Sequence, residues 1–138
     1  MTHRYAYKIM DKVALICIKD KHILITRSKN KTKLYFPGGK REGNETDLAC
    51  LTREIYEELQ VQLIESSATF FGVFDAQADG HQVDIVVRMR CYFADFEGTP
   101  QASNEIESFE WIRYQDKMRT SAVDHLIMDQ LKEMDLID

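Results

Sequence analysis

Apolar and polar residues alternate along the chain in short segments that predict strands. Residues 13–18 form an apolar run, and polar residues 19–21 separate it from a second run at 22–27. Two such runs joined by a short polar turn are typical of a β-hairpin. Further apolar segments predict strands at residues 70–74, 83–96 and 109–114. The chain is therefore expected to build a sheet from several strands.

Two other segments have apolar residues spaced three or four positions apart, which predicts helices. The first has an apolar face formed by Leu48, Leu51, Ile55 and Leu59. Asn44 or Thr46 can cap its N-terminus, and it is expected to end near Gln60. The second begins at Thr120 or Ser121, and its apolar face comprises Val123, Leu126, Ile127, Leu131 and Met134.

Strands and helices mixed within 138 residues predict an α/β fold in which helices pack on a sheet. The length suits one domain spanning residues 1–138, because domains typically contain about 100–200 residues. Hydrophobic residues make up 44% of the chain, which is enough for a core without disulfide bonds. The cysteines are widely spaced and odd in number, and are expected to be reduced and buried: Cys17, Cys50 and Cys91.

Charge and hydropathy limit the classes of partner. The chain has 23 acidic and 18 basic residues, a net charge of −5, which argues against binding a nucleic acid polymer. No apolar run approaches the roughly 20 residues that span a membrane, so no membrane partner is expected. The N-terminal residues resemble no secretory signal, which makes a cytoplasmic location the default.

The most informative feature is an acidic helix that follows two glycines. Glu54, Glu57 and Glu58 lie within about 100° of one another around the predicted helix. Like charges at this spacing repel, so a helix that needed only to be soluble would gain by mixing signs. Gly38 and Gly39 allow close backbone approach beside these carboxylates. Oxygen ligands in this arrangement are what Mg²⁺ prefers, although solvated glutamates are the alternative.

Residues 39–61 resemble the signature of the Nudix hydrolases, G-x5-E-x7-R-E-U-x-E-E-x-G-U, in which U is apolar. The matching residues are Gly39, Glu45, Arg53, Glu54, Ile55, Glu57, Glu58 and Val61. Gln60 replaces the second glycine, and a left-handed backbone there would cost about 1–2 kcal/mol relative to glycine. Residues 23–27 and 34–40 also resemble the MutT-like branch of the family, which hydrolyses triphosphates.

This resemblance implies a Nudix-type α/β/α sandwich with a mixed β-sheet between helices. It also implies hydrolysis of a nucleoside diphosphate linked to another group, with Mg²⁺ as cofactor and Mn²⁺ as the alternative ion. Glu57 and Glu58 would be the principal metal ligands and the Gly38 carbonyl a further one, while Glu54 would be a ligand or the general base. The other charged residues of the signature would position these carboxylates: Arg53 and Glu45.

Outside the signature, Glu105 occupies a place similar to that of an acidic loop residue that family members use as a metal ligand. Glu107 competes for this role, and solvation of both residues is the third reading. The resemblance also implies that Arg27, Gly39 and Lys40 contact substrate, while exposed cations are the alternative reading of Arg27 and Lys40. Other basic residues of the preceding loop are interpreted as solvated: Lys29, Lys31 and Lys33.

Three functions remain open. The first is a MutT-like pyrophosphohydrolase of nucleoside or deoxynucleoside triphosphates, and the second is a nucleotide-sugar pyrophosphatase of the ADP-ribose type. The third is a Nudix-like module that senses a nucleotide without catalysis, which the intact set Glu54, Glu57 and Glu58 disfavours. Each has a small-molecule nucleotide as partner, and a homodimer is compatible with all three.

Overall fold

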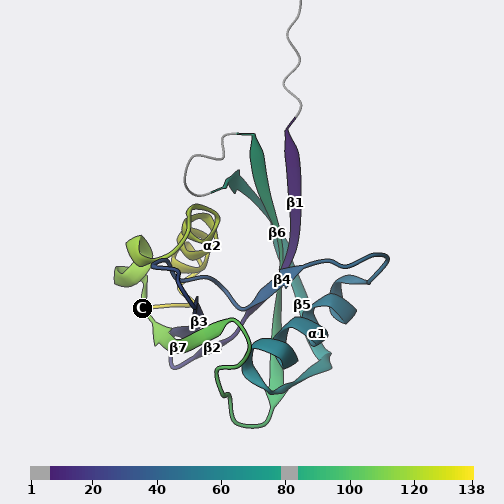
Figure 1. The fold of residues 1–138 in the computed structure, drawn as a ribbon. Coiled ribbons are helices and arrows are strands. Elements are labelled where there is room, and N and C mark those ends of the chain that lie inside the picture. Colours follow the sequence, from purple (N-terminus) through teal and green to yellow (C-terminus); the bar gives the residue numbers. More distant parts are fainter. Residues whose placement is uncertain (1–6, 79–83) are drawn as a thin grey trace, which may run out of the picture.

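A mixed sheet of four strands crosses the protein in the order β4-β1-β6-β5 (Figure 1). The computed structural model describes residues 7–78 and 84–138. The strands are β1 (Lys8–Ile16), β4 (Gly38–Lys40), β5 (Gln62–Gln77) and β6 (Ile85–Glu97). The central pair β1 and β6 is parallel, whereas β4 pairs with β1, and β5 with β6, in antiparallel orientation.

After β1 the chain leaves this sheet and enters a smaller antiparallel sheet in the order β2-β3-β7. Its strands are β2 (Ile18–Lys19), β3 (His22–Ser28) and β7 (Ile106–Ile112). The predicted hairpin is therefore only partly correct, because just the two residues of β2 pair with β3. Residues 13–16 pair with β6 instead. Their continuous apolar run suits a strand that is buried on both faces.

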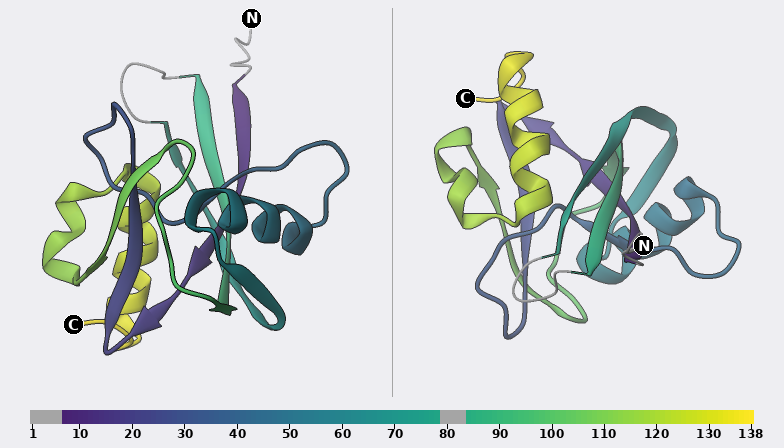
Figure 2. Two further views of the ribbon diagram at one scale, coloured as in Figure 1. Left: turned by 60° about the horizontal axis from the view of Figure 1, so that its bottom comes forward. Right: turned by 90° about the horizontal axis from the view of Figure 1, so that it is seen from above.

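Helices α1 (Asp47–Leu59) and α2 (Ala122–Glu133) lie on opposite sides of the central sheet (Figures 1 and 2). Val13 and Leu15 of β1 belong to the buried cluster that contains α1, whereas Ala14 and Ile16 belong to the one that contains α2. This division arises because successive side chains of a strand point to opposite faces. The predicted α/β/α sandwich is confirmed. A 3₁₀ helix, η1 (Tyr114–Arg119), precedes α2.

The helix boundaries agree with the sequence, but the strand boundaries do so less well. Thr46 caps α1 by accepting the Ala49 N–H at 3.1 Å, and α1 ends immediately before Gln60. Ser121 precedes α2. β5 extends far beyond the predicted residues 70–74. The prediction is too short because polar residues and two shifts in register interrupt the apolar alternation of this strand. The strands predicted at 83–96 and 109–114 are found at 85–97 and 106–112, and Val83 lies outside the described residues.

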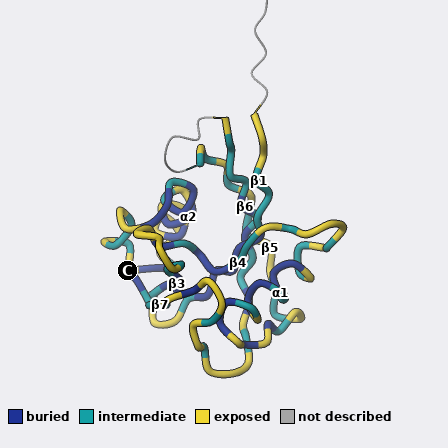
Figure 3. The backbone as a smooth tube through the Cα atoms, in the orientation of Figure 1, coloured by how far each residue is buried: buried dark blue, intermediate teal, exposed yellow. Residues whose placement is uncertain are grey.

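The buried residues form two clusters, one between the central sheet and α1 and one that includes α2 (Figure 3). Leu126 and Met134 were expected on the apolar face of α2 but are 43% and 47% exposed, while Met128 is buried. The predicted buried, unpaired cysteines are confirmed: Cys17, Cys50 and Cys91. Within residues 7–78 and 84–138, no helix is long and apolar enough to cross a membrane.

Candidate active site

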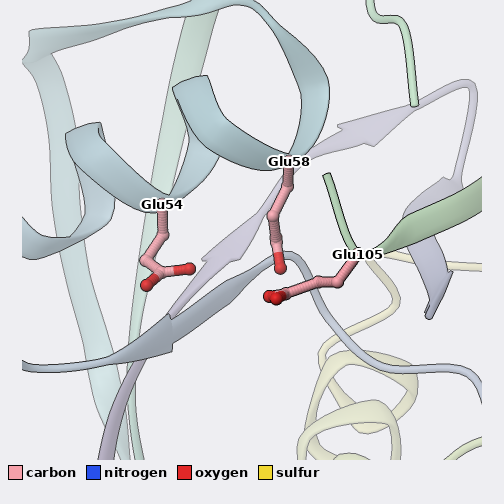
Figure 4. Close-up of side chains that lie close together, drawn as sticks. All are labelled: Glu54, Glu58 and Glu105. Atoms are coloured by element: carbon pink, nitrogen blue, oxygen red, sulfur yellow. The ribbon is translucent and has the colours of Figure 1, made fainter. Parts of the chain in front are cut away.

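Three carboxylates meet beside the C-terminal half of α1. Glu54 and Glu58 extend from α1, and Glu105 approaches them from the loop before β7 (Figure 4). One oxygen of each residue lies within 4.8 Å of the others. Residues four apart share one side of a helix, which places Glu54 beside Glu58. We call these three residues the carboxylate cluster; their oxygen atoms could hold a divalent cation.

Burial changes the protonation of this cluster. Glu54 and Glu58 are only 9% and 6% exposed. Burial, reinforced by the charges of Glu54 and Glu105, raises the pKa of Glu58 to about 8, although the Gly38 N–H that Glu58 accepts at 2.9 Å opposes the shift. Burial also raises the pKa of Glu54, against the opposing effect of Arg53. The metal-free site therefore favours a protonated Glu58 at neutral pH.

These shifts predict how stability depends on pH without metal. Between about pH 4.5 and pH 8 the folded state retains a proton on Glu58 that the unfolded chain has released. The free energy of unfolding should therefore fall as pH rises through this window, by about 1 kcal/mol per pH unit. Between pH 5 and pH 8 in chelator, we expect calorimetry to show the melting temperature falling by about 5–15 °C. A constant or rising melting temperature would contradict this assignment.

Arg53 connects the cluster to the preceding loop. Its Nε and Nη2 donate to the two carboxylate oxygens of Glu45, both at 2.8 Å, and its Nη1 donates to Glu54 at 2.7 Å. Nη2 also donates to the Lys40 carbonyl oxygen at 3.1 Å. The hydrogen bonds from Arg53 lower the pKa of Glu45 to about 2, so Glu45 remains ionised. Arg53 thus joins Glu45 of the loop to Glu54 of the cluster.

Glu57 differs from the expectation that it is a principal metal ligand together with Glu58. Its carboxylate lies 3.4 Å from Arg53 Nη1, and its side chain is 44% exposed. Among the described residues, the carboxylates close enough together to share a cation are those of Glu54, Glu58 and Glu105, without Glu57. At about 100° per residue, Glu57 lies about 60° from Glu54 on the side away from Glu58, which places it beside Arg53 instead.

Gly38 and Gly39 each leave room for a different neighbour. At Gly38, where φ is 141°, an added Cβ would overlap the backbone carbonyl of Val13 in β1. At Gly39, an added Cβ would overlap the carboxylate of Glu54. A strand backbone cannot move aside locally, whereas the end of a glutamate side chain can rotate away. Gly38 is therefore needed for the pairing of β4 with β1, and Gly39 for the position of the Glu54 carboxylate.

We expect substitution by alanine to separate these two roles. Gly38→Ala should lower the free energy of unfolding by about 2–4 kcal/mol, because strain and backbone overlap combine. Gly39→Ala should instead change stability by less than about 1 kcal/mol but lower turnover about 10- to 100-fold, because it displaces Glu54. Denaturant unfolding and initial rates on both variants test this. Equal losses of stability in the two variants would contradict it.

The carboxylate cluster lies in a pocket of about 470 Å³. Gly38, Gly39 and Lys40 line it, as expected for residues that contact ligand or metal. Eight further residues that line it have no site role predicted from the sequence: Lys12, Thr26, Ser28, Lys31, Tyr35, Phe36, Glu42 and Met89. Lys31 was interpreted as solvated. Lys12 reaches the pocket because β1 pairs with β4 in a register that places Lys12 opposite Lys40.

Arg27 is not among the described residues that line this pocket. Its guanidinium lies 2.8 Å from Glu107, the residue that competed with Glu105 for the metal-binding role. Thr26 and Ser28 line the pocket instead. Side chains alternate along β3, so the residue between these two points away from the pocket. The structure therefore brings Glu105 to the cluster but places Arg27 and Glu107 together elsewhere.

A comparison with models of protein families shows to which family the chain belongs. The model of the NUDIX domain matches residues 9–129 of this chain. The chain belongs to the Nudix family. It is a pyrophosphohydrolase of this family, whose members generally use divalent metal ions. A comparison with curated proteins gives no match.

Solved structures share the Nudix fold. The E. coli ORF135 protein superimposes with a TM-score of 0.70 at 23% identity, covering 96% of this chain and 95% of that protein. A MutT protein from Methanosarcina mazei Go1 gives a TM-score of 0.76 at 15% identity, covering 94% and 96%. A bifunctional NMN adenylyltransferase/ADP ribose pyrophosphatase from Francisella tularensis, complexed with AMP and a Mn ion, gives 0.69 at 22% identity over 93% of this chain and 42% of that one.

Proposed function

We propose that this Nudix enzyme hydrolyses nucleoside or deoxynucleoside triphosphates, releasing a nucleoside monophosphate and pyrophosphate. The observation that carries the proposal is that the carboxylate cluster shares its pocket with Lys12, Lys31 and Lys40. Three ammonium groups complement the consecutive negative charges of a triphosphate. Tyr35 and Met89 add apolar surface to the same pocket, which suits a nucleobase. Residues 1–138 would form one Nudix domain with this small molecule as its partner.

The residues present fit Mg²⁺, with Mn²⁺ as the alternative ion. Glu54, Glu58 and Glu105 would hold the ion, and the Gly38 carbonyl would be a further ligand. The fit rests on two buried carboxylates that face a third at close range, a set of like charges that a hard cation compensates. When bound, the cation neutralises phosphate charge and lowers the pKa of coordinated water.

The protein supplies proton transfer and geometry. We propose that Glu54 accepts the proton of the attacking water, because its carboxylate is buried in the cluster beside the site of the cation and is oriented by Arg53. Arg53 donates to Glu54 at 2.7 Å and holds it in one orientation. Glu45, through its two hydrogen bonds with Arg53, fixes that guanidinium. The water oxygen bonds to phosphorus as the anhydride P–O bond breaks, and pyrophosphate departs.

Hydrolysis of ADP-ribose is the second candidate. It is favoured by the likeness in fold to the Francisella tularensis bifunctional protein, an ADP ribose pyrophosphatase complexed with AMP and Mn. The two reactions share one chemistry, because each cleaves a phosphoanhydride bond by attack of water. They differ in the leaving group, which is inorganic pyrophosphate in one and a sugar phosphate in the other.

A substrate screen distinguishes these functions. The full chain is incubated with Mg²⁺ and a panel of nucleoside triphosphates, nucleotide sugars and dinucleoside polyphosphates, and products are separated by chromatography. Formation of monophosphate and pyrophosphate from triphosphates supports the proposal. Preferential formation of AMP and ribose phosphate from ADP-ribose would favour the second candidate. Tight nucleotide binding without any product would instead indicate a sensor.

A further inference from the structure

The loop that carries Glu105 is fastened to the C-terminal end of α1. The backbone N–H of Gln101 donates to the Leu59 carbonyl at 2.9 Å, and that of Ser103 donates to the Glu58 carbonyl at 3.0 Å. Carbonyl groups in the last turn of a helix have no partner within the helix, so a passing loop can bind them. The loop and the helix thus share an interface two residues before Glu105.

Gln60 adds a side-chain link at this interface. Its backbone is left-handed, with φ 57° and ψ 33°, as expected at a position where the family signature has glycine. Its Nε2 donates to the Tyr56 carbonyl at 3.0 Å and to the Ser103 hydroxyl at 3.3 Å. A carbonyl can only accept, which assigns the amide nitrogen to this side. One side chain therefore bridges α1 and the loop.

The position of Glu105 depends on how firmly this loop is held. Glu105 is exposed, yet its carboxylate lies near those of Glu54 and Glu58. Without a cation, the carboxylates of Glu54 and Glu105 repel each other at this range, which would drive the loop outward. The Lys29 N–H, which donates to the Glu105 carbonyl oxygen at 2.7 Å, anchors the loop from β3's side. On the α1 side, Gln60 donates to the Ser103 hydroxyl, and Asn104 Nδ2 donates to the Glu57 carbonyl at 3.5 Å.

We propose that Gln60 is a positioning residue that holds Glu105 against Glu58 for divalent-cation binding. The inference rests on the proposed metal-dependent function. A glutamine in the left-handed conformation is strained where glycine would not be. In return, its side chain makes the bond to Ser103, which acts on the carboxylate cluster through the loop that carries Glu105.

Mn²⁺ binding in the absence of nucleotide tests the inference on the full chain. Gln60→Gly should raise the Mn²⁺ dissociation constant about three- to tenfold, as loss of one such hydrogen bond allows. The melting temperature of the metal-free protein should not fall, because glycine relieves the strain. Ser103→Ala leaves the backbone at Gln60 intact and should weaken Mn²⁺ binding similarly. Gln62→Ala, an exposed neighbour in β5, serves as the matched control.

A variant that combines Gln60→Gly with Ser103→Ala tests the hydrogen bond between these two side chains. If Gln60 acts through Ser103, combining the two substitutions should weaken Mn²⁺ binding no further than Gln60→Gly alone. Unchanged Mn²⁺ affinity in Gln60→Gly, or strictly additive losses, would overturn the inference. Turnover of triphosphate by the parent protein is measured separately. A parent that binds Mn²⁺ but hydrolyses no triphosphate would refute the proposed substrate while the Mn²⁺ series still decides the role of Gln60.

Discussion

Glu58→Gln is expected to lower turnover about a thousandfold, since it removes a charged metal ligand from the carboxylate cluster. At pH 8 the metal-free variant should be at least as stable as the parent, because burying a neutral amide costs less than burying a carboxylate. The amide oxygen can still accept the Gly38 N–H, which lies 2.9 Å from Glu58 in the parent. Initial rates and calorimetry measure both effects.

The same variant also tests the source of the pH dependence. At pH 5, where Glu58 is protonated in the folded parent, the two proteins should have similar stability, and the difference should grow as pH rises to 8. Excess Mg²⁺ should stabilise the parent by about 2–3 kcal/mol at a concentration a hundred times Kd, but barely affect the variant. Glu133→Gln, at the exposed end of α2, is the charge control. Full activity with an undiminished Mg²⁺ effect would remove Glu58 from the site.

Removal of divalent cations should abolish hydrolysis, with a loss of at least about 10⁴-fold in excess chelator. Among the described residues, the hydroxyl groups that line the pocket belong to Thr26, Ser28 and Tyr35, and the phenol of tyrosine is a weak nucleophile at neutral pH. Thr26 already donates its hydroxyl proton to the Tyr35 carbonyl at 3.1 Å. No histidine that could activate Ser28 is among the lining residues in the described part of the chain. The residues of the site therefore offer no substitute for metal-activated water.

Readdition experiments complete this test. Mg²⁺ returned in excess over the chelator should restore the full rate, and Mn²⁺ should restore activity as the alternative ion. The melting temperature should rise with the same ion concentrations, because binding to the folded state links the two measurements. Hydrolysis that persists in chelator with the metal content confirmed as negligible would refute a metal-dependent mechanism for this site.

Local sequence patterns predicted the elements that form from local interactions. The period of α1 and its Thr46 cap follow from contacts three or four residues apart, and both are present in the structure. Strand pairing follows from no such rule. The run at 13–16 resembles one arm of a hairpin in the sequence, but it pairs with β6, 77 residues further along the chain. Residues 13–16 pair with β6 because this position buries their side chains on both faces of the sheet.

The candidate site divides in the same way. The motif by itself determined Glu54, Glu58 and their relation to Arg53, because these side chains are fixed by helical spacing on one element. Only the tertiary structure decided that Glu105 rather than Glu107 joins them, and that Arg27 points away from the pocket. Those outcomes depend on the register of β3 with β7 and on the loop packed against α1, which no local pattern specifies.

The lysines of the pocket illustrate why the surface around the site could not be predicted from the sequence. Lys31 appears in the sequence as one member of a solvated basic run, and Lys12 as a polar residue beside an apolar strand. Folding brings both to the pocket of the carboxylate cluster, because β1 pairs with β4 and Lys31 of the loop after β3 lines the same pocket. Sequence alone determined that Glu54 and Glu58 lie side by side, since both belong to one helix, whereas Glu105 comes from a loop. The surface offered to the substrate is assembled from separate elements, so only their packing decided it.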